Sequence, residues 1–460
     1  MTDHPRRDFL KTVGGAATVA ALTRHAAAQT DTHGRANART RGRIDKIGHL
    51  FPAGDLPRYT YAHVRGDGMY GVVGSFPRGG NLFGSTLYDL ADLANPTEAH
   101  RLESPNPFTR TNHVRFDGTR NGLYYRTWEA DTEAGLEGVE IVDYGWGAGT
   151  PESPQIVGSV ETPNTGVHTI SAHPAAEVIY AVDDADDISA IVPIDVSDPT
   201  DPQIADLFGP PGDCHATEVD ADRDVLHCAY IGGEFEGYAT LDISDPLAPE
   251  VIGQFDYSTR PDNTSLDEVG FSNCHHAHFD PERDLAYVGD EECGGVPGGK
   301  HVFDIGWDTG SLADPQPIGF TRAPDAREQG GDNVDCACFW TGHFHDVTHT
   351  GGEVLLVDGG YRQGTWVANV TDPTNPIPTE RYATDDVDIS ETEDHYPFTP
   401  PYNWSTVYNE ARDFFLSHDT LTGVYTFEVT AQPARARNGG GPPTNYDIEE
   451  IRSRQCVPKE

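Results

Sequence analysis

A nine-residue motif, repeated along the chain, constrains the fold more than any other feature of this sequence. Each complete copy has an Asp or Asn between two hydrophobic residues, followed by Ser or Thr and then Asp-Pro-x-x-Pro. Complete copies occupy residues 194–202, 241–249 and 368–376, and weaker copies surround Asp89, Asp143, Asp304 and Glu428. The seven copies lie 47 to 65 residues apart. A repeat of this length indicates either the blades of a propeller or the turns of a solenoid.

Each repeat contains four short strand-like segments separated by turn residues. In the third repeat these segments are residues 168–171, 178–182, 190–196 and 203–208. Proline has no N–H to donate to a β-ladder, so the Asp-Pro turn ends the third strand and separates it from the outer strand. The pattern predicts an all-β chain in which each repeat forms one four-stranded antiparallel blade.

The two ends of the repeat array decide between a propeller and a solenoid. The seventh repeat stops at Val429, without its Asp-Pro turn and outer strand. An unused strand-like segment, residues 43–51, resembles the outer-strand segment 249–255. We therefore predict that this N-terminal strand completes the last blade and closes a seven-bladed β-propeller over residues 43–430. A chain of 460 residues would otherwise suggest about three domains.

The motif resembles that of the LVIVD-repeat family of exported β-propellers, over most of the chain. The second and fifth repeats depart from the family pattern, because they lack the Asp-Pro turn directly after the third strand. The resemblance implies an extracellular binding or scaffold protein whose ligand is a protein or a polysaccharide. It implies little chemistry, because a fold does not fix a function.

The N-terminus has the order of a twin-arginine export signal. Arg6 and Arg7 precede an apolar stretch over residues 13–22, and three alanines at residues 26–28 fit a cleavage site. The expected segments are a signal peptide at 1–28, a linker at 29–42, the propeller at 43–430 and a flexible C-terminal tail at 431–460. No later apolar run reaches the roughly 18 residues of a transmembrane anchor. We expect a secreted or cell-surface protein.

The charge balance excludes some partners. The chain has 31 Lys and Arg residues against 74 Asp and Glu residues, a net charge of −43. Such a chain repels nucleic acids and anionic lipid surfaces. Only four of the basic residues are lysines, a composition typical of halophilic proteins, in whose surroundings salt screens the repulsion between acidic groups.

A series of histidines occupies one position of the repeat. His113, His168, His215 and His275 each precede the first residue of a predicted second strand by ten residues. His63 joins the series through its local sequence, and His343 and His345 flank the equivalent position in the sixth repeat. Because the first strand of each blade lines the channel of a propeller, these side chains are expected to gather at one channel mouth. The candidate metal ligands are His63, His113, His168, His215, His275, His276, His278, His343 and His345.

Carboxylates and two thiols are expected beside these histidines. The ends of the second strands return to the same mouth and carry Glu129, Asp183, Asp184, Asp290, Glu291, Glu292, Asp358 and Asp419. Imidazole with carboxylate suits zinc, copper, iron or manganese. Cys214 and Cys274 either add thiol ligands, which favour copper or zinc, or form a disulfide between neighbouring inner strands.

Two classes of function follow from these patterns. In the first, the histidines are structural, bonded to backbone carbonyls or water, and the protein is a binding or scaffold propeller. In the second, they bind a transition metal, copper or zinc, and the protein is a metal-dependent enzyme, for which an oxidoreductase is the leading candidate. The sequence has no Gly-rich phosphate loop, G-x-S-x-G elbow or H-E-x-x-H helix that would indicate another chemistry.

Overall fold

The computed structural model describes residues 44–51, 58–77, 81–164, 166–183, 191–259, 271–291, 298–324, 341–387 and 400–431. These residues form 29 β-strands and one 3₁₀ helix, η1 (Tyr257–Thr259), which confirms the all-β prediction. No helix in this part of the chain is long and apolar enough to span a membrane. The predicted signal peptide, the linker and residues 432–460 of the predicted tail lie outside the described residues.

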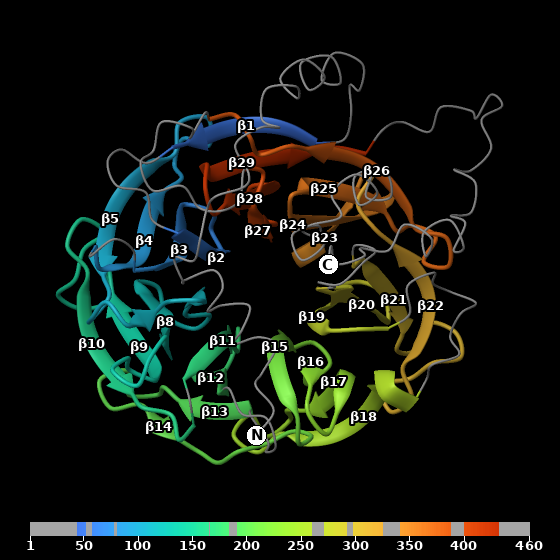
Figure 1. Cartoon of the computed structure of the whole chain (residues 1–460), viewed down its shortest axis with the longest axis horizontal. Coiled ribbons are helices and arrows are strands. Elements are labelled where there is room, and N and C mark those ends of the chain that lie inside the picture. The colour runs from blue at the N-terminus through green and yellow to red at the C-terminus, as the bar shows by residue number, and fades with distance from the viewer. Residues whose placement is uncertain are drawn as a thin grey trace, which may run out of the picture.

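Antiparallel sets of strands follow one another around a common centre, with the first strand of each set innermost (Figure 1). Each set is called a blade and is named by its innermost strand. The β2 blade contains β2 (Arg58–Val64), β3 (Tyr70–Phe76), β4 (Phe83–Asp89) and β5 (Thr97–Glu103). The β7 blade contains β6 (Thr109–Arg110), β7 (Val114–Phe116), β8 (Leu123–Ala130), β9 (Gly138–Asp143) and β10 (Gln155–Val160). The β11 blade contains β11 (Val167–Ala172), β12 (Val178–Asp183), β13 (Ile191–Asp195) and β14 (Gln203–Ile204).

The same arrangement continues through the second half of the chain. The β15 blade contains β15 (Asp213–Asp220), β16 (Val225–Gly232), β17 (Glu236–Asp242) and β18 (Glu250–Asp256). The β19 blade contains β19 (Cys274–Phe279), β20 (Leu285–Asp290), β21 (Lys300–Asp304) and β22 (Gln316–Thr321). The β23 blade contains β23 (Thr341–Thr350), β24 (Glu353–Tyr361), β25 (Gly364–Asn369) and β26 (Ile377–Tyr382). The β27 blade contains β27 (Asn403–Asn409), β28 (Phe414–Asp419), β29 (Gly423–Val429) and β1 (Ile44–Leu50).

The first strand of the structure pairs with the last one, as the sequence predicted. β1 runs antiparallel to β29, with Ile44 opposite Val429 and Leu50 opposite Val424. A single parallel pairing, between Phe344 and Ser405, also links the inner strands of the β23 and β27 blades. β1 is therefore the outer strand of the last blade among the described residues.

Apolar side chains fill the spaces between neighbouring blades. β12 and β20, the second strands of their blades, are buried at every residue. Tyr125 of β8, Ile179 of β12 and Val192 of β13 belong to one such cluster, between the β7 and β11 blades. A strand buried on both faces shows a continuous apolar run rather than alternation. The core is therefore divided into clusters between blades.

The outer strands carry a glycine where they cross a turn of the next blade. A Cβ atom would overlap a backbone carbonyl oxygen of that turn in four cases, which are Gly48 against Leu93, Gly158 against Pro199, Gly253 against Leu312 and Gly319 against Pro373. Only glycine permits this close approach of two backbones. The Ile-Gly pair shared by segments 43–51 and 249–255 thus marks the contact of an outer strand with the next blade.

The first Asp or Asn of the repeat motif stabilises the turn after the third strand. Asp195, Asp242 and Asn369 each accept a hydrogen bond from the backbone N–H two residues later, at 2.8 to 2.9 Å. In the second and fifth repeats, where no Asp-Pro turn directly follows the third strand, Asp143 accepts hydrogen bonds from four backbone N–H groups and Asp304 from five. The first Asp of the motif therefore keeps its role in the turn where the rest of the motif is lost.

Candidate metal centre

A β-bulge interrupts the innermost strands at the position of the histidine series. The residue omitted from the ladder is His168 in β11, His215 in β15 and His275 in β19. A bulge leaves one residue unpaired and redirects its side chain. The ladder omits Thr60 and Tyr61 in β2, His343 and Phe344 in β23, and Trp404 in β27, and His113 lies in the break between β6 and β7. The side chains at these positions are called the bulge layer.

The bulge layer gathers around the buried ring of Phe344. The Phe344 ring centroid lies 5.8 Å from that of His113, 6.1 Å from that of His215 and 5.1 Å from that of His275. The β7, β15 and β23 blades are not neighbours along the ring in Figure 1, so these contacts cross its centre. The repeated position in the sequence therefore brings side chains from distant blades together.

Four imidazoles of the bulge layer form a continuous row. Ring centroids are 4.7 Å apart between His168 and His215, 3.7 Å between His215 and His275, and 4.2 Å between His275 and His343. His113 is not in this row and stacks on Tyr61, with centroids 3.6 Å apart.

Side-chain donors reach the backbone carbonyls at the bulges. The pairs are Thr60 Oγ1 to Thr111 O (2.8 Å), Asn112 Nδ2 to His168 O (3.1 Å), Thr169 Oγ1 to His215 O (2.6 Å), His215 Nδ1 to His275 O (2.7 Å), Lys300 Nζ to His343 O (2.6 Å) and His343 Nδ1 to Trp404 O (2.5 Å). In each pair the donor belongs to the preceding blade. Buried carbonyls outside a ladder need such donors. Some histidines thus also have the structural role that was one of the two interpretations of the sequence.

These bonds fix the tautomers of two imidazoles. A carbonyl oxygen only accepts, so His215 and His343 carry a hydrogen on Nδ1. Burial lowers the pKa of His275 and of His343 well below its usual value, which keeps both rings neutral. The lone pair of His343 is therefore on Nε2. This division, with Nδ1 bonded to a carbonyl and the lone pair on Nε2, is typical of metal-binding histidines.

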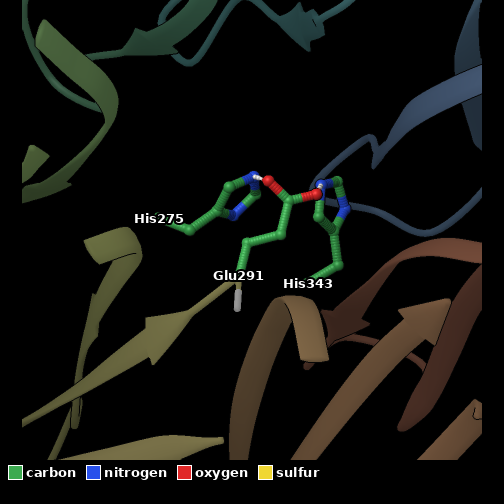
Figure 2. Close-up of side chains that lie close together, drawn as sticks. All are labelled: His275, Glu291 and His343. Atoms are coloured by element: carbon green, nitrogen blue, oxygen red, sulfur yellow. Dashed lines mark ion pairs between the residues drawn. The ribbon is translucent and has the colours of Figure 1, made fainter. Parts of the chain in front are cut away.

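His275, Glu291 and His343 point toward one another in Figure 2 and form a compact cluster. Glu291 Oε2 lies 3.5 Å from His275 Nε2, and Glu291 Oε1 lies 3.6 Å from His343 Nε2. Ligand atoms of the three residues all lie within 4.8 Å of one another. Ligands about 2.1 Å from one tetrahedral ion are about 3.4 Å apart. Small side-chain movements would therefore bring this set onto one ion.

His168 has partners on both of its ring nitrogens. Its Nδ1 lies 3.1 Å from Glu129 Oε2, and its Nε2 lies 2.9 Å from Asn112 Nδ2. Arg110 in turn donates to Glu129 Oε1 at 2.9 Å. The predicted approach of a second-strand carboxylate to the histidine series therefore occurs twice, at Glu129 and at Glu291.

A second group of side chains, called the charged layer, lies three residues further along three of these strands. Glu218, His278 and Asp346 follow His215, His275 and His343 by three positions, and Arg115, His276 and His345 join them. Arg115 of the β7 blade and Glu218 of the β15 blade form a buried ion pair. Burial opposes the ionisation of Glu218, but the guanidinium of Arg115 holds the pKa of that carboxyl well below its usual range.

The histidines of the charged layer contact one another and its carboxylates. His276 Nδ1 lies 3.1 Å from His345 Nδ1, and His276 Nε2 lies 3.7 Å from Glu218 Oε1. His278 Nε2 lies 3.5 Å from Asp346 Oδ1. Burial lowers the pKa of His276 to about 4. Of the nine predicted ligands, these three histidines therefore lie in the charged layer, apart from the His275–Glu291–His343 cluster.

His63 is in register with the charged layer. His63 pairs with Val72 and Arg115 pairs with Tyr125, each the third residue of a second strand. The ring of His63 accepts a hydrogen bond from the Phe116 N–H at 3.1 Å. The local sequence match between His63 and His113 is therefore out of register, because His63 precedes the first residue of β3 by seven residues, whereas His113 precedes that of β8 by ten.

The disulfide predicted as one alternative for Cys214 and Cys274 is absent. Cys214, Cys228 and Cys274 are all buried and none of them is in a disulfide, so Cys214 is not joined to Cys274. Cys214 packs with Val178 and Leu226 between two blades. Burial raises the pKa of the Cys274 thiol well above its usual value, which disfavours the thiolate that binds metals. Because side chains alternate along a strand, Cys214 and Cys274, which directly precede the bulge residues, face the space between blades rather than the centre of the ring.

Most of the other predicted carboxylates stabilise loops or pair with the chain's own donors. Asp183 accepts from Asn164 N at 2.9 Å, and Asp419 accepts from Tyr402 N at 2.5 Å. Asp358 forms a buried ion pair with Lys300 at 2.8 Å. Asp290 lies 2.8 Å from the His301 ring. Asp184 and Glu292 lie outside the described residues.

Sequence reasoning missed Tyr361, Lys300 and Arg115. Tyr361 is the last residue of β24, and its hydroxyl lies 2.8 Å from His343 Nε2. Tyr361 could have been predicted, because the ends of the second strands were expected to lie beside the histidines. Only acidic residues were considered at these strand ends. Nothing in the repeat pattern indicated Lys300 or Arg115.

Comparisons with known proteins identify the fold alone. No family model matches the chain, and no curated protein matches it. A solved structure that does match is the β-propeller domain of Cps50 (Swd1) from Myceliophteria thermophila, with a TM-score of 0.53 and 10% identity, over 84% of this chain and 100% of that one. This protein therefore has a β-propeller fold. Because 1004 chains of solved structures match, the likeness does not select a function.

Proposed function

We propose that this propeller binds one transition-metal ion, zinc or copper, through His275, Glu291 and His343. The observation that supports this proposal is the cluster itself, in which two buried, neutral imidazoles face the two oxygens of one carboxylate. Two histidines and one glutamate form a known ligand set of catalytic zinc, and the same donors suit copper. His215 supports the set, because its Nδ1 holds the carbonyl of the bulge that carries His275.

Three protein ligands leave a coordination position for water or a substrate, as in catalytic metal sites. When bound, the ion would supply Lewis acidity or, in the case of copper, one-electron chemistry. The chain's own contribution is to hold the two imidazoles neutral, by burial, and to orient His343 through its bond to the Trp404 carbonyl. We therefore favour a metal-dependent enzyme over a scaffold whose histidines are only structural.

Metal titration tests this function. Metal-stripped protein is titrated with Zn²⁺ and with Cu²⁺ by calorimetry, and the bound metal is counted by elemental analysis after washing. We expect one ion per chain. Removing one ligand, in His275→Gln or His343→Gln, should weaken binding by at least about tenfold.

A matched control separates this site from adventitious binding by imidazole. His100 lies on the outer strand β5, where its ring contacts the Glu152 carbonyl, so His100→Gln should bind metal as tightly as the unmodified protein. Circular dichroism confirms that each variant is folded. Absence of bound metal in the unmodified protein, or equal affinity in His275→Gln, would exclude the proposed function.

We also propose that the chain forms a seven-bladed propeller closed by β1 and is an exported, halophilic member of the LVIVD-repeat group. The β1–β29 ladder and the contact of Gly48 with the next blade support closure. The three complete copies of the motif support the family, and the twin-arginine pattern supports secretion or a cell-surface location. The acidic composition supports a high-salt environment.

A binding or scaffold role is the second candidate, and two exposed tryptophans favour it. Trp146 and Trp307 are 42% and 46% exposed, on the loops that Asp143 and Asp304 hold through backbone hydrogen bonds. An exposed indole on an ordered loop suits contact with a protein or a polysaccharide. This role remains if no metal binds.

A further inference from the structure

Tyr361 lies beside the proposed metal cluster and is almost fully buried, at 1% exposure. Its Oη atom is 2.8 Å from His343 Nε2, and its ring centroid is 4.4 Å from that of His343. Tyr361 ends β24, so it occupies the same end of a second strand as Glu291, which follows β20. Two neighbouring blades thus each place an oxygen atom beside His343 Nε2.

The direction of this hydrogen bond follows from the tautomer of His343. Nδ1 of His343 donates to the Trp404 carbonyl at 2.5 Å, so in the neutral ring Nε2 is an acceptor. The Tyr361 hydroxyl therefore donates its hydrogen to Nε2. The phenol occupies the lone pair that an ion at His343 would use. An ion cannot bind there while this hydrogen bond persists.

The distance between Tyr361 Oη and His343 Nε2 indicates whether both atoms can bind the same ion. Two ligand atoms on one ion, at right angles and about 2.1 Å from it, lie about 3 Å apart. The Oη–Nε2 distance of 2.8 Å is close to this value. An ion at Nε2 would therefore be within bonding distance of Oη with little movement of either ring.

We propose that Tyr361 is the fourth ligand of the proposed centre, bound as a phenolate, and that the complete set selects copper(II). This inference rests on the proposed function. On binding, the phenolic O–H bond breaks, the proton leaves to solvent, and an oxygen lone pair forms the bond to the ion. His275, His343, Glu291 and Tyr361 then give two nitrogen and two oxygen ligands, a set that suits copper(II) in tetragonal geometry, in which the ion can still take a water or a substrate as a further ligand.

The surroundings hold Tyr361 in place for this role. Its ring stacks on Tyr402, with centroids 4.3 Å apart and planes 8° from parallel. An isolated β-bridge also joins the backbones of the two residues. A ligand on a rigid, packed side chain keeps its geometry.

Copper titration with optical detection tests the inference. A phenolate bound to copper(II) absorbs visible light through charge transfer from oxygen to metal. We expect the unmodified protein to show this band, saturating at one Cu²⁺ per chain, and to bind Cu²⁺ more tightly than Zn²⁺. Tyr361→Phe should abolish the band and weaken Cu²⁺ binding by about 10- to 100-fold.

Tyr402→Phe is the matched control, because it keeps the aromatic pair and changes a hydroxyl that is not on His343. It should retain both the band and the affinity. Resonance Raman spectra of the unmodified copper protein test for a copper–phenolate bond without any variant. Copper bound at one ion per chain with no phenolate band, or Tyr361→Phe with an unchanged band and affinity, would overturn the role of Tyr361 and leave the proposed function standing. Absence of Cu²⁺ binding by the unmodified protein would overturn the inference, and absence of both Cu²⁺ and Zn²⁺ binding would overturn the proposed function as well.

Discussion

His275 and His276 are neighbours in β19, yet they belong to layers that balance charge in different ways. His276, in the charged layer, faces Glu218, whose charge is already compensated by Arg115 of another blade. His275, in the bulge layer, faces Glu291, and the two imidazoles that contact this carboxylate are both neutral. The charged layer therefore contains an ion pair between blades, whereas the carboxylate of the cluster contacts two neutral imidazoles, which are groups that bind metals.

This difference shows how one inner strand serves two purposes. A bulge turns one residue toward the centre, and the ladder then resumes, so residues three positions apart form separate layers. The same repeat position is Arg115 in one blade and Glu218 in another, which pairs non-adjacent blades. We infer that the charged layer stabilises the assembled blades and that the cluster in the bulge layer binds a ligand.

The largest expected effect is on stability, from removing the cation of the charged layer. Arg115→Ala leaves Glu218 buried and without its partner, which should lower the free energy of unfolding by about 3–5 kcal/mol. Urea unfolding followed by circular dichroism measures it. The double variant Arg115→Met, Glu218→Leu removes both charges and should recover much of the loss. If Arg115→Ala unfolds like the unmodified protein, the charged layer does not hold the blades together.

Lowering the pH should reduce the free energy of unfolding through the buried neutral histidines, while the Arg115–Glu218 ion pair stays ionised. Burial lowers the pKa of His276 to about 4 and that of His418, on β28, to about 3. The unfolded chain binds protons below pH 6.5 and the folded chain does not, so stability should fall as the pH drops from about 6.5 to about 4. Each such histidine contributes about 1.4 kcal/mol per pH unit.

Urea unfolding of the metal-free protein at several pH values measures this slope. His418→Asn should reduce the slope, because it removes one histidine whose proton affinity differs between the two states. Arg115→Ala should lower stability most near neutral pH and flatten the curve, because without the guanidinium burial raises the pKa of Glu218, and its protonation then relieves the unpaired charge as the pH falls. Stability independent of pH over this range would show that these histidines are not held neutral by the fold.

The smallest stability effect is expected in the cluster. Glu291→Gln keeps the shape of a side chain that is 14% exposed, so the metal-free variant should unfold within about 1 kcal/mol of the unmodified protein. The same change should weaken metal binding by at least about tenfold. Thermal unfolding with and without Zn²⁺ measures both effects. A loss of stability as large as that of Arg115→Ala would make Glu291 a structural residue and remove the contrast between the layers.

Much of the fold and part of the site could be predicted from the sequence. The motif copies marked the third strand of each blade, the missing outer strand after Val429 predicted its pairing with Ile44–Leu50, and the ten-residue spacing identified the shared position of His168, His215 and His275. These features are local or periodic, so a single chain displays them. His63 was assigned to the wrong layer, because its local sequence matches that of His113, although it precedes its second strand by seven residues rather than ten.

The sequence by itself determined that each repeat is a four-stranded unit and that histidines recur on its inner strand, because hydrophobic spacing and proline turns act over a few residues. Only the tertiary structure decided which of these histidines face a carboxylate. Acidic residues end many second strands, and their roles depend on contacts between blades that are distant in the chain, such as Glu291 with His343 or Asp358 with Lys300. The tertiary structure also decided which ring nitrogen of His215 and of His343 carries the lone pair, because the other nitrogen donates its hydrogen to a backbone carbonyl of the next blade.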